Sequence, residues 1–103
     1  MNEMQEKVNE VMKKYHLESS TEVCMIDLVS EVGELGKEVL KGDDYGRKGF
    51  LITDNTESEL GDVLFSLICL ANNMHISLET ALENVLLKYE KRFNDKGNIG
   101  SGK

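Results

Sequence analysis

The stretch from Leu60 to Ala71 is the feature that most constrains what this chain can fold into. Its apolar residues fall on nearly every side of a helix: Leu60, Val63, Leu64, Phe65, Leu67, Ile68, Cys69, Leu70 and Ala71. A helix that is apolar all round is normally covered by other helices. Yet Glu59 and Asp62 lie three residues apart at its first turn. Because burying two carboxylates is costly unless cations compensate their charge, we expect a covered helix whose acidic end binds cations.

Helical patterns extend over most of the chain. Apolar residues recur at helical spacing, 30% of the residues are charged, and the sequence contains no proline. This combination favours a helix bundle over a sheet protein. We expect an all-α domain with four helices, over about residues 3–15, 20–40, 56–72 and 78–93.

Local sequence patterns indicate where the helices begin and end. Ser19 and Thr56 are each followed three residues later by a glutamate, which is the spacing of a capping box. Ser77 is expected to cap the fourth helix. The second helix is expected to end at Gly42, where glycine can adopt the left-handed conformation. Residues 43–55 carry further glycines and mixed charges and are interpreted as a loop.

A length of 103 residues predicts a single domain, which we place at 1–93, with a flexible tail at 94–103. The tail contains a G-x-x-x-x-G-K pattern at Gly97–Lys103, but no strand pattern precedes it, so we do not interpret it as a phosphate-binding loop. So small a domain buries a modest fraction of its surface. We therefore expect a four-helix bundle completed by oligomerisation, as a homodimer or homotetramer.

The charge balance narrows the range of partners. The formal net charge is −7, from 19 acidic and 12 basic residues, and an acidic surface repels the backbone of long nucleic acids. The longest apolar run is too short to cross a bilayer, and the polar N-terminal segment is unlike a signal peptide. We expect a cytoplasmic protein without membrane contact. Cys24 and Cys69 lie in apolar helical stretches without C-x-x-C spacing and are interpreted as reduced core residues.

The second expected helix carries an acidic stripe, formed by Asp27, Glu31, Glu34 and Glu38. Their spacings place all of them on one helix face, and such a stripe alone is typical of a solvated surface. Opposite Glu59 and Asp62, however, the pair Glu31 and Glu34 would complete a set of facing carboxylates. Oxygen-only ligand sets of this kind suit Mg²⁺. The alternative for Glu59 is the capping role, which would leave its carboxylate less free to bind a metal.

Three segments together resemble the MazG-like family of all-α nucleotide pyrophosphohydrolases. Glu31–Glu34 matches the family's E-E-x-x-E segment, with Ser30 standing where the family often has its first glutamate. Glu59–Asp62 matches the E-x-x-D segment, and Lys88–Phe93 resembles the later Lys-aromatic-x-x-Arg-Phe segment. The resemblance covers about residues 3–93. It implies hydrolysis of a nucleoside triphosphate to the monophosphate and pyrophosphate, in nucleotide-pool house-cleaning, with Mg²⁺ or else Mn²⁺ as cofactor.

The resemblance also implies roles for individual residues. The metal ligands would be Glu31, Glu34, Glu59 and Asp62. The substrate phosphates would be contacted by Lys88 and Arg92, with Lys91 as a weaker candidate. Glu31 or Glu38 would accept the proton of the attacking water. Two alternatives stay open, a phosphoribosyl-ATP pyrophosphohydrolase of shared helical architecture and a non-catalytic dimerisation or regulatory module.

Overall fold

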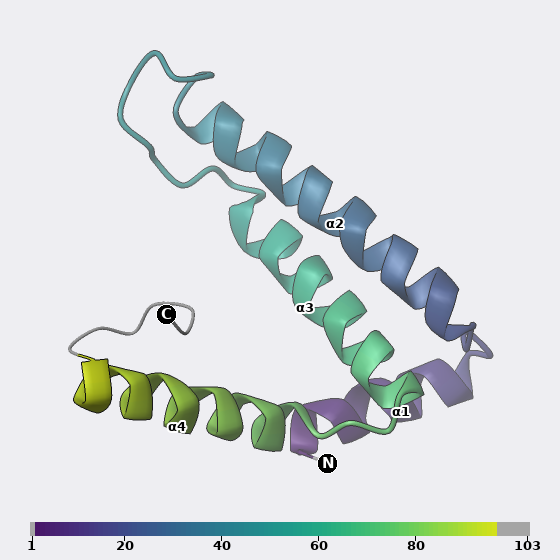
Figure 1. Cartoon of the computed structure of the whole chain (residues 1–103). Coiled ribbons are helices and arrows are strands. Elements are labelled where there is room, and N and C mark those ends of the chain that lie inside the picture. Colours follow the sequence, from purple (N-terminus) through teal and green to yellow (C-terminus); the bar gives the residue numbers. More distant parts are fainter. Residues whose placement is uncertain (1, 97–103) are drawn as a thin grey trace.

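The computed structural model describes residues 2–96, and within that range it contains helices and no strand. The four helices are α1 (Glu3–Lys14), α2 (Thr21–Gly42), α3 (Thr56–Asn73) and α4 (Leu78–Lys96), shown in Figure 1. The all-α expectation is confirmed. The last helix continues to Lys96, beyond its expected end at 93. The rest of the expected tail, including the pattern at Gly97–Lys103, lies outside the described residues.

The long helices α2 and α3 lie side by side and antiparallel, and α1 packs across the C-terminal half of α3 (Figure 1). The buried apolar residues gather where these three helices meet: Cys24, Ile68, Leu70 and Ala71. Both cysteines are free thiols, and Cys24 is buried whereas Cys69 is partly exposed. The core of a single chain is therefore small and lies at the end of α3 that is far from Glu59 and Asp62.

Helix α4 extends away from the other helices (Figure 1) and leaves α3 at an angle of 100°. In a closed four-helix bundle the apolar side chains of α4 would face inward, but Leu82, Leu86 and Phe93 are 58%, 55% and 55% exposed. Helix α3 is also less covered than expected, because Leu60 and Leu64 are exposed. Within residues 2–96, one chain does not close into a four-helix bundle.

The dimensions of the chain agree with this open shape. The radius of gyration of the Cα atoms is 17.0 Å, against about 13 Å for a compact domain of similar length. None of the described helices alone is long and apolar enough to cross a membrane, and α3 and α4 reach that composition only when taken together across their bend.

The capping boxes predicted for α2 and α3 are wrong in detail. Ser20, not Ser19, caps α2, because its Oγ accepts a hydrogen bond from the backbone N–H of Val23 at 3.1 Å. The carbonyl of Ser19 instead accepts a hydrogen bond from Asn73 Nδ2 at 2.8 Å, which ties the start of α2 to the end of α3. Neighbouring serines offer equivalent capping oxygens, and this contact with α3 selects between them. At α4 the expected cap is confirmed by a 3.3 Å bond from Thr80 N–H to the Ser77 hydroxyl.

Thr56 is the first residue of α3 rather than its cap. Its hydroxyl accepts a hydrogen bond from the backbone N–H of Thr53 at 3.0 Å, so it closes the preceding loop instead of the helix. The residue at the cap position, Asn55, makes no side-chain capping bond. Thr56 and Glu59 therefore do not form the capping box that was the alternative to metal binding for Glu59.

Gly42 ends α2 for a different reason from the one expected. It remains helical, and the left-handed conformations occur later, at Asp44, Tyr45 and Gly46. A Cβ atom at position 42 would lie 2.5 Å from the Phe50 ring and 2.6 Å from the carbonyl oxygen of Leu51. Glycine is needed here because the returning loop approaches the helix backbone closely.

We predict that Gly42→Ala lowers the free energy of unfolding by about 1–3 kcal/mol, because the added methyl group displaces the loop. Gly36→Ala on the same helix is the matched control, since nothing lies within 4 Å of its Cβ position. Alanine there should stabilise the helix by up to about 1 kcal/mol. Urea unfolding of the two variants checks the opposite signs; a neutral Gly42→Ala would mean that the loop does not hold this position.

Candidate metal centre

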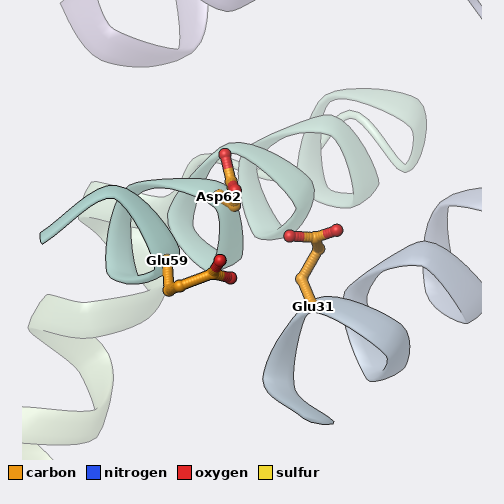
Figure 2. A group of neighbouring side chains, drawn as sticks. All are labelled: Glu31, Glu59 and Asp62. Carbon is orange, nitrogen blue, oxygen red and sulfur yellow. The ribbon is translucent and has the colours of Figure 1, made fainter. Parts of the chain in front are cut away.

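Three carboxylates from two helices converge at the middle of the α2–α3 pair. One oxygen from each of Glu31, Glu59 and Asp62 lies within 4.8 Å of the others. Figure 2 shows Glu31 reaching from α2 toward the two acidic side chains of α3. This is the group expected from the sequence, without Glu34.

The helix starts explain this convergence. Because α3 begins at Thr56, Glu59 and Asp62 fall in its first two turns, three residues apart and therefore on one face. The partial positive charge of the α3 N-terminus favours acids at these positions. Glu31 lies near the middle of α2, which packs antiparallel against α3 and so brings its side chain opposite that face.

The cluster is more exposed than the sequence predicted. Glu31 and Glu59 are partly exposed and Asp62 is exposed. One chain leaves the first turns of α3 open. The cost of burying carboxylates under an all-apolar helix, which was expected from the sequence, therefore does not arise. Mutual repulsion between the carboxylates remains as the electrostatic cost.

That repulsion acts on Glu31 most clearly. The pKa of Glu31 is raised above its ordinary value of 4.5, first by the loss of surrounding water and then by the negative charges of Asp62, Glu59, Glu34 and Asp27. A carboxylate held among like charges favours its protonated form. A bound cation relieves the same repulsion, so the site favours either a proton or a metal ion.

The donor set fits Mg²⁺ or Mn²⁺. Carboxylate oxygens are the ligands that these hard cations prefer, and Mg²⁺ usually binds through a few carboxylates while keeping positions for water and for substrate phosphates. Glu31, Glu59 and Asp62 supply three such oxygens on an open surface. No histidine or cysteine belongs to this group, which agrees with a hard-cation site.

Glu34 lies near this cluster but outside it. Its charge contributes to the raised pKa of Glu31, yet its oxygens are not among those that converge. A spacing of three residues turns Glu34 by about 60° around α2 from Glu31, and its side chain is exposed. The structure thus brings together three of the four expected ligands.

Glu38 has a different environment. Its side chain is buried, with 5% of the residue exposed, and its carboxylate accepts a hydrogen bond from the Thr53 hydroxyl. Lys41 Nζ lies 3.7 Å from the other carboxylate oxygen. Glu38 follows Glu31 by seven residues, about 10 Å along the helix. Glu38 holds the loop against α2. Its partner Thr53 was not identified from the sequence, because no local pattern marks a contact across 15 residues.

The basic residues of α4 do not reach the cluster within one chain. Lys88 and Lys91 are exposed and Arg92 is partly exposed. The nitrogen of Lys88 lies 5.4 Å, and the guanidinium carbon of Arg92 5.8 Å, from the centre of the Tyr89 ring. These contacts gather positive charge around one aromatic side chain, but Figure 1 shows α4 directed away from α2 and the first turns of α3.

A small cavity lies between α1, α2 and α3 on the core side of the cluster, and none of Glu31, Glu59 and Asp62 lines it. Asp27 lines it one turn before Glu31, and Phe65 and Ser66 line it one turn after Asp62. Met12 of α1 forms another part of its wall. The cavity therefore combines apolar and polar groups within one helical turn of the carboxylates.

Comparisons with known proteins agree with the all-helical fold. The family model of the MazG nucleotide pyrophosphohydrolase domain matches residues 19–96. The chain is similar to a crystal structure of a Bacillus-conserved MazG protein, described as a nucleotide pyrophosphohydrolase, with 38% identity, a TM-score of 0.70 and 84% of each chain covered. It is also similar to the structure of YpjD from Bacillus subtilis, described as a candidate pyrophosphatase, with 38% identity, a TM-score of 0.73 and coverage of 89% of this chain and 94% of that one.

In sequence, the chain is 44% identical over 75 residues to YpjD of Bacillus subtilis (strain 168), a protein described as uncharacterised. The match covers 70% of this chain and 66% of YpjD, so it spans just under two thirds of that relative's length.

The raised pKa of Glu31 gives a prediction about stability without metal. A carboxyl group whose pKa is higher in the folded than in the unfolded chain adds stability at low pH, which is lost as the pH rises through the folded pKa. In EDTA, Glu31→Gln should therefore raise the melting temperature relative to wild type, and the gain should grow as the pH rises above about 4.5. In millimolar Mg²⁺ the order should reverse, because the variant lacks a ligand. Thermal melts across pH measure both effects; equal melting temperatures at every pH would contradict the crowding of charge around Glu31.

Proposed function

Because this chain belongs to the family of MazG nucleotide pyrophosphohydrolase domains, we propose that it hydrolyses a nucleoside triphosphate to the monophosphate and pyrophosphate, using Mg²⁺ or Mn²⁺. The observation that carries the proposal is the convergence of Glu31, Glu59 and Asp62 to within 4.8 Å on an open surface. Glu34, three residues after Glu31, is proposed as a fourth ligand.

The proposed chemistry divides between the metal and the side chains. Glu59 and Asp62 would hold the metal ion, which would supply charge neutralisation for the triphosphate and acidify a water at the site. Glu31 is the better candidate than Glu38 to accept the proton of the attacking water, because Glu38 is buried and already accepts a hydrogen bond from Thr53.

The cavity beside the cluster is the proposed site for the base of the nucleotide. It lies within one turn of Glu31 and Asp62, and its walls combine the apolar surfaces of Met12 and Phe65 with the oxygens of Asp27 and Ser66. Apolar walls with a few polar groups are the usual lining of sites for small ligands. A base held there would leave its phosphates near the carboxylates.

The proposed enzyme is a homodimer or homotetramer whose site needs a second copy. Leu82, Leu86 and Phe93 leave an apolar stripe of α4 exposed, and the apolar residues Leu60 and Leu64 of α3 are exposed too. Symmetric association of two chains can cover both surfaces. If α4 of one chain packs on α3 of the other, Lys88, Arg92 and, less directly, Lys91 approach the partner's carboxylates and bind the substrate phosphates there.

Metal binding can be measured without any substrate. We predict that millimolar Mg²⁺ or Mn²⁺ raises the melting temperature of the wild-type chain above its value in EDTA, because a ligand of the folded state stabilises it by mass action. Asp62→Asn, which keeps the side-chain size, should remove most of this increase. Identical melting temperatures with metal and with EDTA would favour a solvated acidic surface and a non-catalytic helical module.

Activity is tested by pyrophosphate release from a panel of NTPs, dNTPs and phosphoribosyl-ATP, with and without Mg²⁺. We predict that Asp62→Asn slows the reaction at least about 100-fold, equivalent to about 2.7 kcal/mol or more in the barrier. Lys88→Ala should mainly raise KM, because it is proposed to bind phosphate rather than metal. Release from phosphoribosyl-ATP alone would identify that substrate class instead, and release from none would contradict the enzyme.

Coexpression of Asp62→Asn with Lys88→Ala tests whether the site is shared between copies. If Lys88 acts on the partner's site, each mixed dimer contains one site with both residues intact, and random pairing restores about a quarter of the wild-type rate. If Lys88 acts on its own chain's site, no intact site forms and nothing is restored. The matched control is coexpression of Asp62→Asn with Glu59→Gln, which leaves every cluster with one damaged ligand and restores nothing in either case.

A further inference from the structure

The largest fully buried side chain among residues 2–96 is polar. Gln5 of α1 is 0% exposed. Burying an amide is costly unless its donors and acceptor are hydrogen-bonded, so a buried glutamine marks a place where the fold uses those bonds. The surrounding sequence gives no sign of it, because Gln5 lies among polar and charged residues of an amphipathic helix.

The side-chain amide of Gln5 links α1 to the connection between α3 and α4. Its Nε2 donates to Asn72 Oδ1 at 3.0 Å and to the Ile76 carbonyl at 2.8 Å. Its Oε1 accepts from the backbone N–H of Leu78 at 2.8 Å. Asn72 Nδ2 donates in return to the Gln5 carbonyl at 3.0 Å. One side chain therefore bonds to the end of α3, to the connection and to the first residue of α4.

These hydrogen bonds lie at the connection between α3 and α4, here called the corner, which sets the direction of α4. The first N–H groups of a helix have no partner within it, and Gln5 supplies one for Leu78. The Ile76 carbonyl, on the other side of Ser77, is held by the same amide. Because α4 packs extensively on no other described helix, its angle of 100° to α3 depends strongly on this corner.

A small rotation of α4 at the corner displaces the basic residues near its other end by a large distance. Lys88 follows Leu78 by ten residues, about 15 Å along the helix axis. A rotation of about 20° at the corner would displace Lys88 by roughly 5 Å, whereas a misplacement of about 1 Å can already cost a large part of a binding or catalytic effect.

We propose that Gln5 is a positioning residue, whose amide fixes the direction of α4 and thereby places Lys88 and Arg92 for binding phosphate. This role rests on the proposed function of α4 in substrate binding. It does not involve the metal cluster, since Glu31, Glu59 and Asp62 are carried by α2 and α3 alone.

The test compares Gln5→Leu and Gln5→Glu in the full chain with Glu6→Gln, a matched change at an exposed position of the same helix. Glutamate at position 5 can still accept from Leu78 but, with at most one O–H donor, cannot donate to both Asn72 and Ile76. Both Gln5 variants should raise KM about tenfold, leave kcat within about twofold and leave the Kd for Mn²⁺ unchanged. Combining Gln5→Leu with Lys88→Ala should raise KM by less than the product of the two separate effects, because both act in part through Lys88.

A direct measurement of the helix angle separates this role from general loss of structure. Spin labels at positions 57 and 83, in a chain with Cys24→Ala and Cys69→Ala, report the distance between α3 and α4 in labelled chains diluted with unlabelled ones. The distance distribution should be narrow with Gln5 and broadened or shifted in the variants. If Gln5→Leu does not fold, Gln5→Glu carries the same measurements.

An unchanged distance distribution would overturn the proposal, and so would a broadened one with unchanged KM. A parallel loss of Mn²⁺ binding and kcat would also overturn it, because it would show Gln5 acting on the whole fold. If the wild-type chain hydrolyses no nucleotide, the proposed function fails, while an unchanged label distance in the Gln5 variants would separately overturn the role of Gln5 at the corner.

Discussion

The packing of α2 against α3 is the contact on which the rest of the structure depends. It holds three like charges within 4.8 Å of one another, an arrangement that the side chains alone would avoid. The apolar contacts between the helices stabilise the pair, and the carboxylates oppose it; the pKa of Glu31 is raised by loss of surrounding water and then by the neighbouring negative charges. Because the cluster is partly open to water, the repulsion is tolerable without a cation and a metal ion can enter directly. A deeply buried cluster would have bound cations more tightly and exchanged them more slowly.

The sequence predicts the elements of this arrangement well, because they follow from local periodicity. Helical spacing gives four helices, and the interval of three residues places Glu59 and Asp62 on one face. It predicts details poorly where neighbouring residues are chemically equivalent. Ser19 and Ser20 both carry a hydroxyl that could cap α2; Ser20 caps the helix, whereas the carbonyl of Ser19 contacts Asn73 and its hydroxyl contacts Cys24. Glu31 and Glu34 lie on one stripe, yet their offset around the helix decides which of them faces α3.

Contacts between distant parts of the chain could not be predicted from patterns of this kind. Glu38 looked like one more member of an acidic stripe, and its bond to Thr53 depends on the path of the loop. Gln5 looked like a surface residue of α1, and its burial depends on the connection more than seventy residues later. The covering of α3 was also predicted incorrectly, because the prediction relied on composition alone. An all-apolar α3 indicates that something covers the helix, but composition does not say whether the cover comes from the same chain.

In the proposed enzyme, metal binding and phosphate binding belong to different parts of the chain, the α2–α3 pair and α4. Helices α2 and α3 carry the proposed metal ligands within one chain, so the proposed metal binding requires no second copy. Helix α4, which leaves α3 at 100°, carries Lys88 and Arg92. Gln5 binds its first residue, and its apolar stripe is exposed. In the proposed dimer, binding of the triphosphate would depend on the connection between α3 and α4 and on the partner surface that contacts α4. Association and substrate binding would then be thermodynamically linked, each strengthening the other, whereas association and metal binding need not be.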